Sequence, residues 1–172
     1  MLWDTDPLSC PMCGEKRIFP YGDKNSPFLI VGGFPSRADM ERGRPFSGDD
    51  GYVLMQEMGL LGLDLKRLRV MRFWGHPQKG SSTYSCNQYF IEQVIEEAKS
   101  KKLILLIGAE AVEYFCKKSP REWNGLVVQS SYFSAPCVIS IQLDHVFKST
   151  VGEVRFALRN FANYVRRLQD ER

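Results

Sequence analysis

The stretch Pro27–Ser36, "PFLIVGGFPS", shows the pattern on which the fold is built. A short apolar run ends at two glycines, Gly32 and Gly33, and a proline precedes it. Apolar runs of this length, bounded by glycine or proline, are typical of strands buried on both faces of a parallel sheet. The same format recurs in residues 68–75, 101–108 and 136–142. The sequence therefore predicts four buried strands.

Helical patterns separate these predicted strands. Apolar residues recur at helical spacing in residues 51–62, 87–102, 109–118 and 151–168. Alternation of strands and helices predicts an α/β fold, a three-layer α/β/α sandwich with a mainly parallel four-stranded central sheet. The 172 residues fit one domain over residues 1–172. The carboxyl ends of its strands are where such a sheet binds ligands.

The composition limits the classes of function. No apolar stretch reaches the roughly 18 residues of a membrane span, so we expect no membrane partner, a cytoplasmic location and a monomer. The five cysteines of a cytoplasmic protein argue against a disulfide framework. The net charge is only +3, but basic residues gather near residues 66–72, 99–102 and 117–121. They form either a local phosphate-binding face or ordinary solvated faces.

A Cys-x-x-Cys pair precedes the first predicted strand. Cys10 and Cys13 lie in "CPMCG", a spacing that lets two thiolates bind one ion. A redox pair is the alternative, but redox pairs usually follow a strand at the start of a helix. We predict a structural metal in an N-terminal metal-binding segment, residues 8–27, with His76 and Cys86 as the further candidate ligands.

The first strand end carries a candidate slot for a flat ring. Gly32 and Gly33 allow close approach of a ligand, and "GRPF" (residues 43–46) adds an arginine and a phenylalanine set by a proline. Such a slot would stack a flat ring while a guanidinium holds a phosphate. Ordinary core packing of Phe46 is the alternative. The two histidines, His76 and His145, each follow a predicted strand and are either catalytic or simply hydrogen-bonded.

In this order, the parts resemble the uracil-DNA glycosylase superfamily, and most closely its iron–sulfur branch, family 4. That family has an N-terminal Cys-x-x-Cys, a strand ending in Gly-Glu-Ala-Pro-Gly, a six-residue spacer and Gly-Arg-Pro-Phe. This chain has "GGFPS" (residues 32–36), the same spacer and "GRPFSGDDG" (residues 43–51). The later segments "LRVMRFWGHP", "CNQYFIEQVIEEAKSKKLILLIGAEAVEYF" and "QLDHVF" also have counterparts in the family.

Several positions depart from the family pattern. Gly33 stands where the family has the glutamate that places the attacking water, and Arg72 where it has the asparagine that contacts the uracil edge. His76 stands at a cluster cysteine, and Val146–Phe147 replace the proline and serine after the loop histidine. Without that asparagine, discrimination for uracil is lost.

The resemblance implies site residues by position. The expected base-binding residues are Gly32, Gly33, Phe34, Pro35, Phe46 and Arg72. The expected catalytic residues are His145, Asp50 and Asp49, with Asp39 and Asp144 as further carboxylate candidates. The expected DNA-binding residues are Arg44, Ser36 and Lys148. The cofactor implied by the family is a [4Fe–4S] cluster, and zinc suits the Cys10, Cys13, His76 and Cys86 set equally well.

These features lead to one functional hypothesis and one alternative. The hypothesis is a DNA glycosylase that flips out and excises a modified pyrimidine, such as a 5-substituted cytosine or uracil of phage-type DNA, leaving an abasic site. A role in genome defence against phage is conceivable. The alternative is a catalytically inactive module of the same fold that binds DNA or a modified base, since fold does not carry activity.

Overall fold

A computed structural model describes residues 8–78, 84–144 and 151–171 of the chain. Four parallel strands form the centre of the sheet in the order β3 (Arg69–Arg72), β2 (Phe28–Gly32), β4 (Leu103–Ile107) and β6 (Cys137–Ser140). The four predicted strands and the mainly parallel sheet are therefore confirmed. Two-residue strands, β1 (Tyr21–Gly22) and β5 (Val127–Val128), extend the sheet to six by pairing antiparallel at its two edges.

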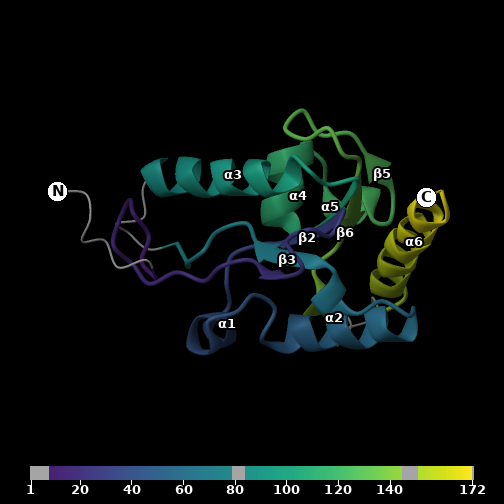
Figure 1. Cartoon of the computed structure of the whole chain (residues 1–172), viewed down its shortest axis with the longest axis horizontal. Coiled ribbons are helices and arrows are strands. Elements are labelled where there is room, and N and C mark those ends of the chain that lie inside the picture. Colours follow the sequence, from purple (N-terminus) through teal and green to yellow (C-terminus); the bar gives the residue numbers. More distant parts are fainter. Residues whose placement is uncertain (1–7, 79–83, 145–150, 172) are drawn as a thin grey trace.

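Helices cover both faces of the sheet (Figure 1). On one face lie α1 (Arg37–Arg42), α2 (Asp49–Leu60) and α6 (Val151–Asp170); on the other lie α3 (Tyr84–Ala98), α4 (Ala109–Cys116) and α5 (Pro120–Trp123). A short 3-10 helix, η1 (Leu65–Arg67), precedes β3. This is the predicted three-layer α/β/α sandwich.

Alternation along β2 divides its side chains between two hydrophobic cores. Leu29 and Val31 pack into the core beneath α3 and α4, whereas Phe28 and Ile30 pack into the core beneath α2 and α6. All five residues of β2 and of β4 are buried, which explains their unbroken apolar sequence.

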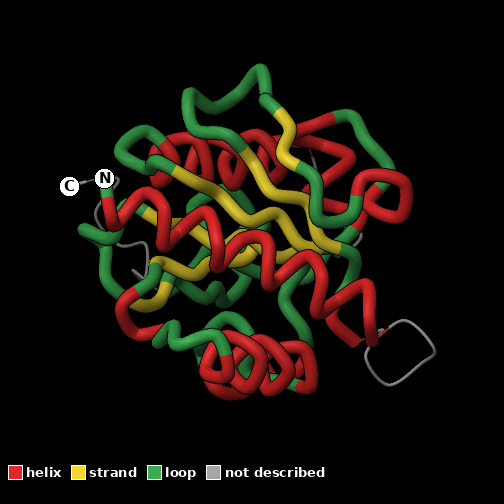
Figure 2. Tube along the Cα trace, turned by 90° about the vertical axis from the view of Figure 1, so that its right-hand side faces the viewer, coloured by secondary structure: helices red, strands yellow, loops and turns green. Residues whose placement is uncertain are grey.

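Helix α6 closes the second core. Its buried stripe includes Val154, Leu158, Phe161 and Val165, spaced three or four residues apart. Figure 2 shows this long helix running across the strands. Among the described residues, no helix is both long enough and apolar enough to cross a membrane.

The order of the strands places a topological switch point between β2 and β4. The chain leaves β2 through α1 and α2 and returns on one side as β3; it leaves β4 through α4 and α5 and returns on the other side as β6. Where adjacent connections run in opposite directions, the carboxyl ends of the two strands open a ligand-binding crevice. Gly32–Gly33 and Gly108 lie at those two ends.

Candidate active site and metal centre

Phe46 packs directly against the end of β2. A Cβ atom on Gly32 would lie only 2.5 Å from Phe46 Cζ, so glycine is required for this approach. Phe46 itself adopts a left-handed backbone conformation with φ of 56°, and its side chain is only 8% exposed. The ring is thus held at the strand end, where the sequence predicted it.

The guanidinium of Arg72 covers one face of the Phe46 ring. Its central carbon lies 4.0 Å from the ring centroid, which is a cation–π contact. The sequence predicted both residues for base binding but not their contact, and the structure brings them together. The guanidinium therefore blocks access to this face of the ring.

Two carboxylates hold Arg72 in place. Its Nε donates to Asp39 Oδ2 at 2.6 Å and its Nη2 to Asp50 Oδ2 at 2.7 Å. Asp39 is fully buried and also accepts hydrogen bonds from the Ser47 and Ser36 backbone amides. The buried Arg72 therefore belongs to a polar network in which both carboxylates are already paired.

The predicted catalytic acids differ in their surroundings. Asp50 is largely buried and paired with Arg72, whereas Asp49 is exposed at the start of α2. Asp144 is exposed at the end of the described segment after β6. His145 and Lys148 lie outside the described residues, so their predicted roles stay predictions.

The remaining predicted site residues have structural contacts of their own. Ser36 caps α1, where its hydroxyl accepts from the Asp39 amide at 3.1 Å. Phe34 packs edge-on against Trp74 at 5.4 Å, on the α3 side of the sheet, and Pro35 is buried. Arg44 is exposed, and its guanidinium lies 4.7 Å from the Tyr21 ring centroid.

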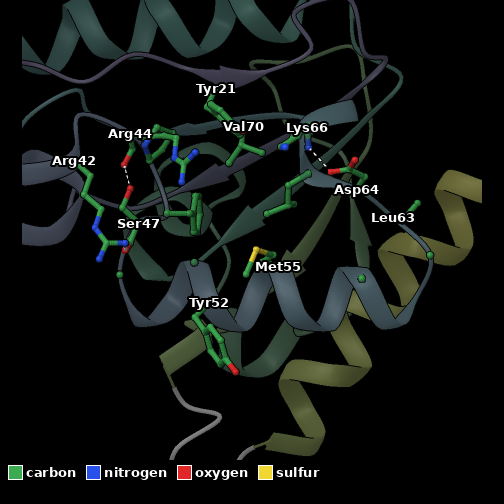
Figure 3. Close-up of a pocket in the computed structure, with 17 residues that line it drawn as sticks. Tyr21, Arg42, Arg44, Ser47, Tyr52, Met55, Leu63, Asp64, Lys66 and Val70 are labelled. Carbon is green, nitrogen blue, oxygen red and sulfur yellow. Dashed lines mark hydrogen bonds between the residues drawn. The ribbon is translucent and has the colours of Figure 1, made fainter.

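A cavity of about 630 Å³ lies beside Phe46, between α2 and the β1–β3 edge. Figure 3 shows Tyr21, Arg44 and Val70 on the side opposite α2, which contributes Met55. The cavity has an apolar floor with basic residues at its margin. Neither its position nor its lining could be predicted from the sequence, because its walls come from separated segments.

Four predicted metal ligands converge beyond the end of β3, on the α3 side of the sheet. One donor atom from each of Cys10, Cys13, His76 and Cys86 lies within 4.8 Å of the others. The Cys10 and Cys86 sulfurs are 4.0 Å apart, and Cys13 Sγ lies 3.4 Å from His76 Nε2. Tetrahedral zinc with Zn–S distances near 2.3 Å separates its donors by roughly 3.5–3.8 Å, so the set fits a metal ion.

Local structure orients these ligands. The Cys10 amide donates to the Glu15 carbonyl and the Gly14 amide to the Cys10 carbonyl, which forms a tight knuckle. His76 Nδ1 lies 2.8 Å from the Pro77 carbonyl, which leaves Nε2 to face the thiols. Burial, reinforced by Cys13 and Cys10, raises the pKa of the Cys86 thiol to about 12. A cation in this cluster would favour the thiolate.

Sequence reasoning missed one carboxylate at the crevice. Glu110, the second residue of α4, lies over Gly33, with Oε2 only 2.9 Å from the position of a Cβ atom there. The only signal in the sequence was its place two residues after the glycine that ends a strand. That signal does not indicate which neighbouring strand the side chain reaches.

Comparison with known proteins gives a family match and a similar solved structure. The model of the uracil DNA glycosylase superfamily matches residues 19–161. A solution NMR structure of a candidate uracil DNA glycosylase from Methanosarcina acetivorans is 13% identical, and the match covers 84% of this chain and 96% of that chain, with a TM-score of 0.49. Comparison with curated proteins gives no match. The closer resemblance to family 4 stays a prediction. By the extent of the family match, the chain belongs to the uracil DNA glycosylase superfamily.

Proposed function

We propose that this protein is a DNA glycosylase that hydrolyses the N-glycosidic bond of a modified pyrimidine, with cytosine derivatives as its substrate class. Membership of the superfamily supports action on DNA. The observation that carries the proposal is Arg72, which lies against Phe46 at the predicted base site. The base would be flipped from the duplex before cleavage.

The chemistry of Arg72 favours a cytosine edge over a uracil edge. A guanidinium only donates hydrogen bonds, so it suits the O2 and N3 acceptors of cytosine and cannot satisfy the N3–H donor of uracil. Gly33 carries no side chain at the strand end, but the Glu110 carboxylate occupies the space beside it, so this position does not select a substituent on the base. A 5-substituted cytosine, as in phage-type DNA, presents the acceptors that suit Arg72, and a role in genome defence stays a prediction.

The predicted roles of the other residues follow from charge. Cleavage leaves the electron pair of the glycosidic bond on the base, and Arg72 together with His145 would stabilise that negative charge. Arg44, exposed beside the Phe46 loop, would contact a phosphate, as would Lys148. Movement of Arg72 off the Phe46 ring would admit the base, which makes this side chain a gate.

The test uses a panel of duplexes that contain uracil, hypoxanthine, 5-hydroxymethylcytosine or glucosylated 5-hydroxymethylcytosine. After incubation and alkali treatment, we expect strand breaks at a 5-substituted cytosine and none at uracil. The H145A variant serves as a control that should lose rate and retain DNA binding. Intact strands on every duplex of the panel would exclude the proposal.

A binding module without catalysis is the second candidate. It is favoured by the absence of a carboxylate side chain at Gly33 and by the guanidinium that covers Phe46. Such a module would retain a modified-base duplex in a gel-shift assay while producing no abasic sites. Formation of abasic sites therefore separates the two candidates.

For the cofactor, we propose one zinc ion held by Cys10, Cys13, His76 and Cys86. The donor separations support a single ion, since the irons of a [4Fe–4S] cube would hold four ligands farther apart. When bound, the ion would crosslink the N-terminal knuckle, the loop after β3 and the start of α3. Metal analysis of the purified protein distinguishes zinc from iron, and a brown cluster absorbing near 400 nm would contradict zinc.

A further inference from the structure

The Glu110 carboxylate lies over two strand-end glycines. A Cβ atom on Gly33 would meet all three atoms of the carboxylate, Oε2 at 2.9 Å, Cδ at 3.0 Å and Oε1 at 3.2 Å. A Cβ atom on Gly108 would lie 3.6 Å from the same Oε2. Glycine at position 33 leaves the space that the carboxylate fills, whereas the atom closest to a Cβ on Gly108 would be Gln142 Oε1 at 2.3 Å.

These glycines end β2 and β4, the pair of strands that form the crevice of the sheet. Gly33 follows Gly32, and Gly32 is the residue against which Phe46 packs. Because neighbouring Cα atoms are 3.8 Å apart, the Phe46 ring edge and the Glu110 carboxylate are separated by at most about 12 Å. This upper limit places the two side chains close enough to contact the base and the sugar of one nucleotide.

Glu110 also differs from Asp39 and Asp50 in its charge balance, as does the exposed Asp49. Asp39 and Asp50 are paired with the Arg72 guanidinium. Glu110 is exposed, and among the described residues no side chain forms an ion pair with it. Its negative charge is therefore available to a ligand in the crevice.

We propose that Glu110 is the carboxylate that faces the deoxyribose of the flipped nucleotide. This inference rests on the proposed glycosylase function. As the C1′–N bond breaks, its electron pair leaves with the base, and Glu110 stabilises the positive charge on the sugar. A water oxygen then bonds to C1′ and gives one proton to Glu110, which passes it to solvent, while the departing base anion takes up one proton from solvent; the products are the neutral free base and an abasic sugar.

The position of Glu110 at the start of α4 has a simpler explanation, and the test must distinguish that explanation from a role at the sugar. An acidic residue in the first turn of a helix is favourable wherever it occurs. Glu113, on the same helix and also exposed, provides a matched control for loss of one negative charge. The decisive readout must depend on a positive charge at the sugar and on no particular base.

Abasic analogues supply that readout. Affinity is measured for duplexes with a cationic pyrrolidine abasic analogue and with the neutral tetrahydrofuran analogue. We expect the wild type and E113Q to prefer the cationic duplex by about tenfold, as a charge pair near a protein surface gives. E110Q should bind both duplexes equally, with unchanged affinity for tetrahydrofuran. Equal preference in E110Q and wild type, or no preference in the wild type, overturns the proposal.

A rescue variant tests the position of the carboxylate. The assay uses a modified duplex that the wild type cleaves. On it, E110A should slow single-turnover excision by about a hundredfold. Adding G33E to E110A should recover most of the rate, because it returns a carboxylate to the same space. No recovery, together with an unchanged melting temperature, counts against the assigned position. A panel without any cleaved base defeats the proposed function, while the analogue affinities still decide whether Glu110 faces the sugar.

Discussion

Removal of the Asp39 carboxylate is the most direct test of the polar network beneath the candidate site. Asp39 is fully buried, and its carboxylate accepts from Arg72 Nε at 2.6 Å, the Ser47 amide at 2.8 Å and the Ser36 amide at 3.3 Å. In D39A all three donors lose this acceptor, and the buried guanidinium keeps only Asp50. Breaking a buried ion pair by removing one partner costs about 3–5 kcal/mol.

Because Asp50 still neutralises Arg72, we expect D39A to lie near the lower end, about 3 kcal/mol. For a chain of this size each kcal/mol lowers the melting temperature by about 2–4 °C, so the expected decrease is about 6–12 °C. Urea unfolding followed by circular dichroism measures the free energy of unfolding. The matched control is E41A, which removes an exposed pair with Arg37 on the same helix and should change stability by less than about 1 kcal/mol.

A second variant separates the charge from the packing. In the D39A/R72M double variant, methionine removes the buried guanidinium, and part of the lost stability should return because no buried charge is left with half of its partners. A loss below about 1 kcal/mol in D39A would refute the reasoning. So would a double variant in which R72M lowers the free energy of unfolding as much as it does in the wild type.

Three further predictions concern other parts of the molecule. C86S should abolish retention of one zinc per chain in native mass spectrometry and lower the melting temperature, whereas C116S, which lies outside the ligand set, should retain the metal. G32A should cost about 1–3 kcal/mol in urea unfolding, since its Cβ would lie 2.5 Å from Phe46 Cζ; an unchanged midpoint contradicts the packing. Burial lowers the pKa of Lys101 in the folded protein. Between that lowered pKa and the ordinary value of about 10.4, the unfolded chain therefore binds more protons than the folded protein does. In that pH range the free energy of unfolding of the wild type should rise relative to that of K101M as the pH rises. A difference between the two proteins that does not change with pH contradicts this prediction.

The fold could be predicted because its signals are local. An apolar run closed by glycine indicates a buried strand within a few residues, and this held for all four parallel strands. The edge strands β1 and β5 were missed, because two residues carry no periodicity. The short helices α1 and α5 were missed for the same reason.

The candidate site was only partly predictable. The positions of Phe46 and Arg72 followed from the resemblance, but their stacked contact and the two carboxylates on the guanidinium did not. Glu110 was missed entirely, because its side chain crosses from the end of one strand to that of its neighbour. Local spacing carries no information on such a contact.

The sequence by itself determined the class of fold, the order of its strands and helices, and the residue types able to hold a metal, because periodicity and ligand chemistry belong to short segments. Only the tertiary structure decided which charges meet. Asp39 pairs with Arg72, and Glu110 lies over Gly33, through strand pairing that brings distant segments together. Electrostatic interactions depend on distance in space, and separation along the chain does not fix that distance.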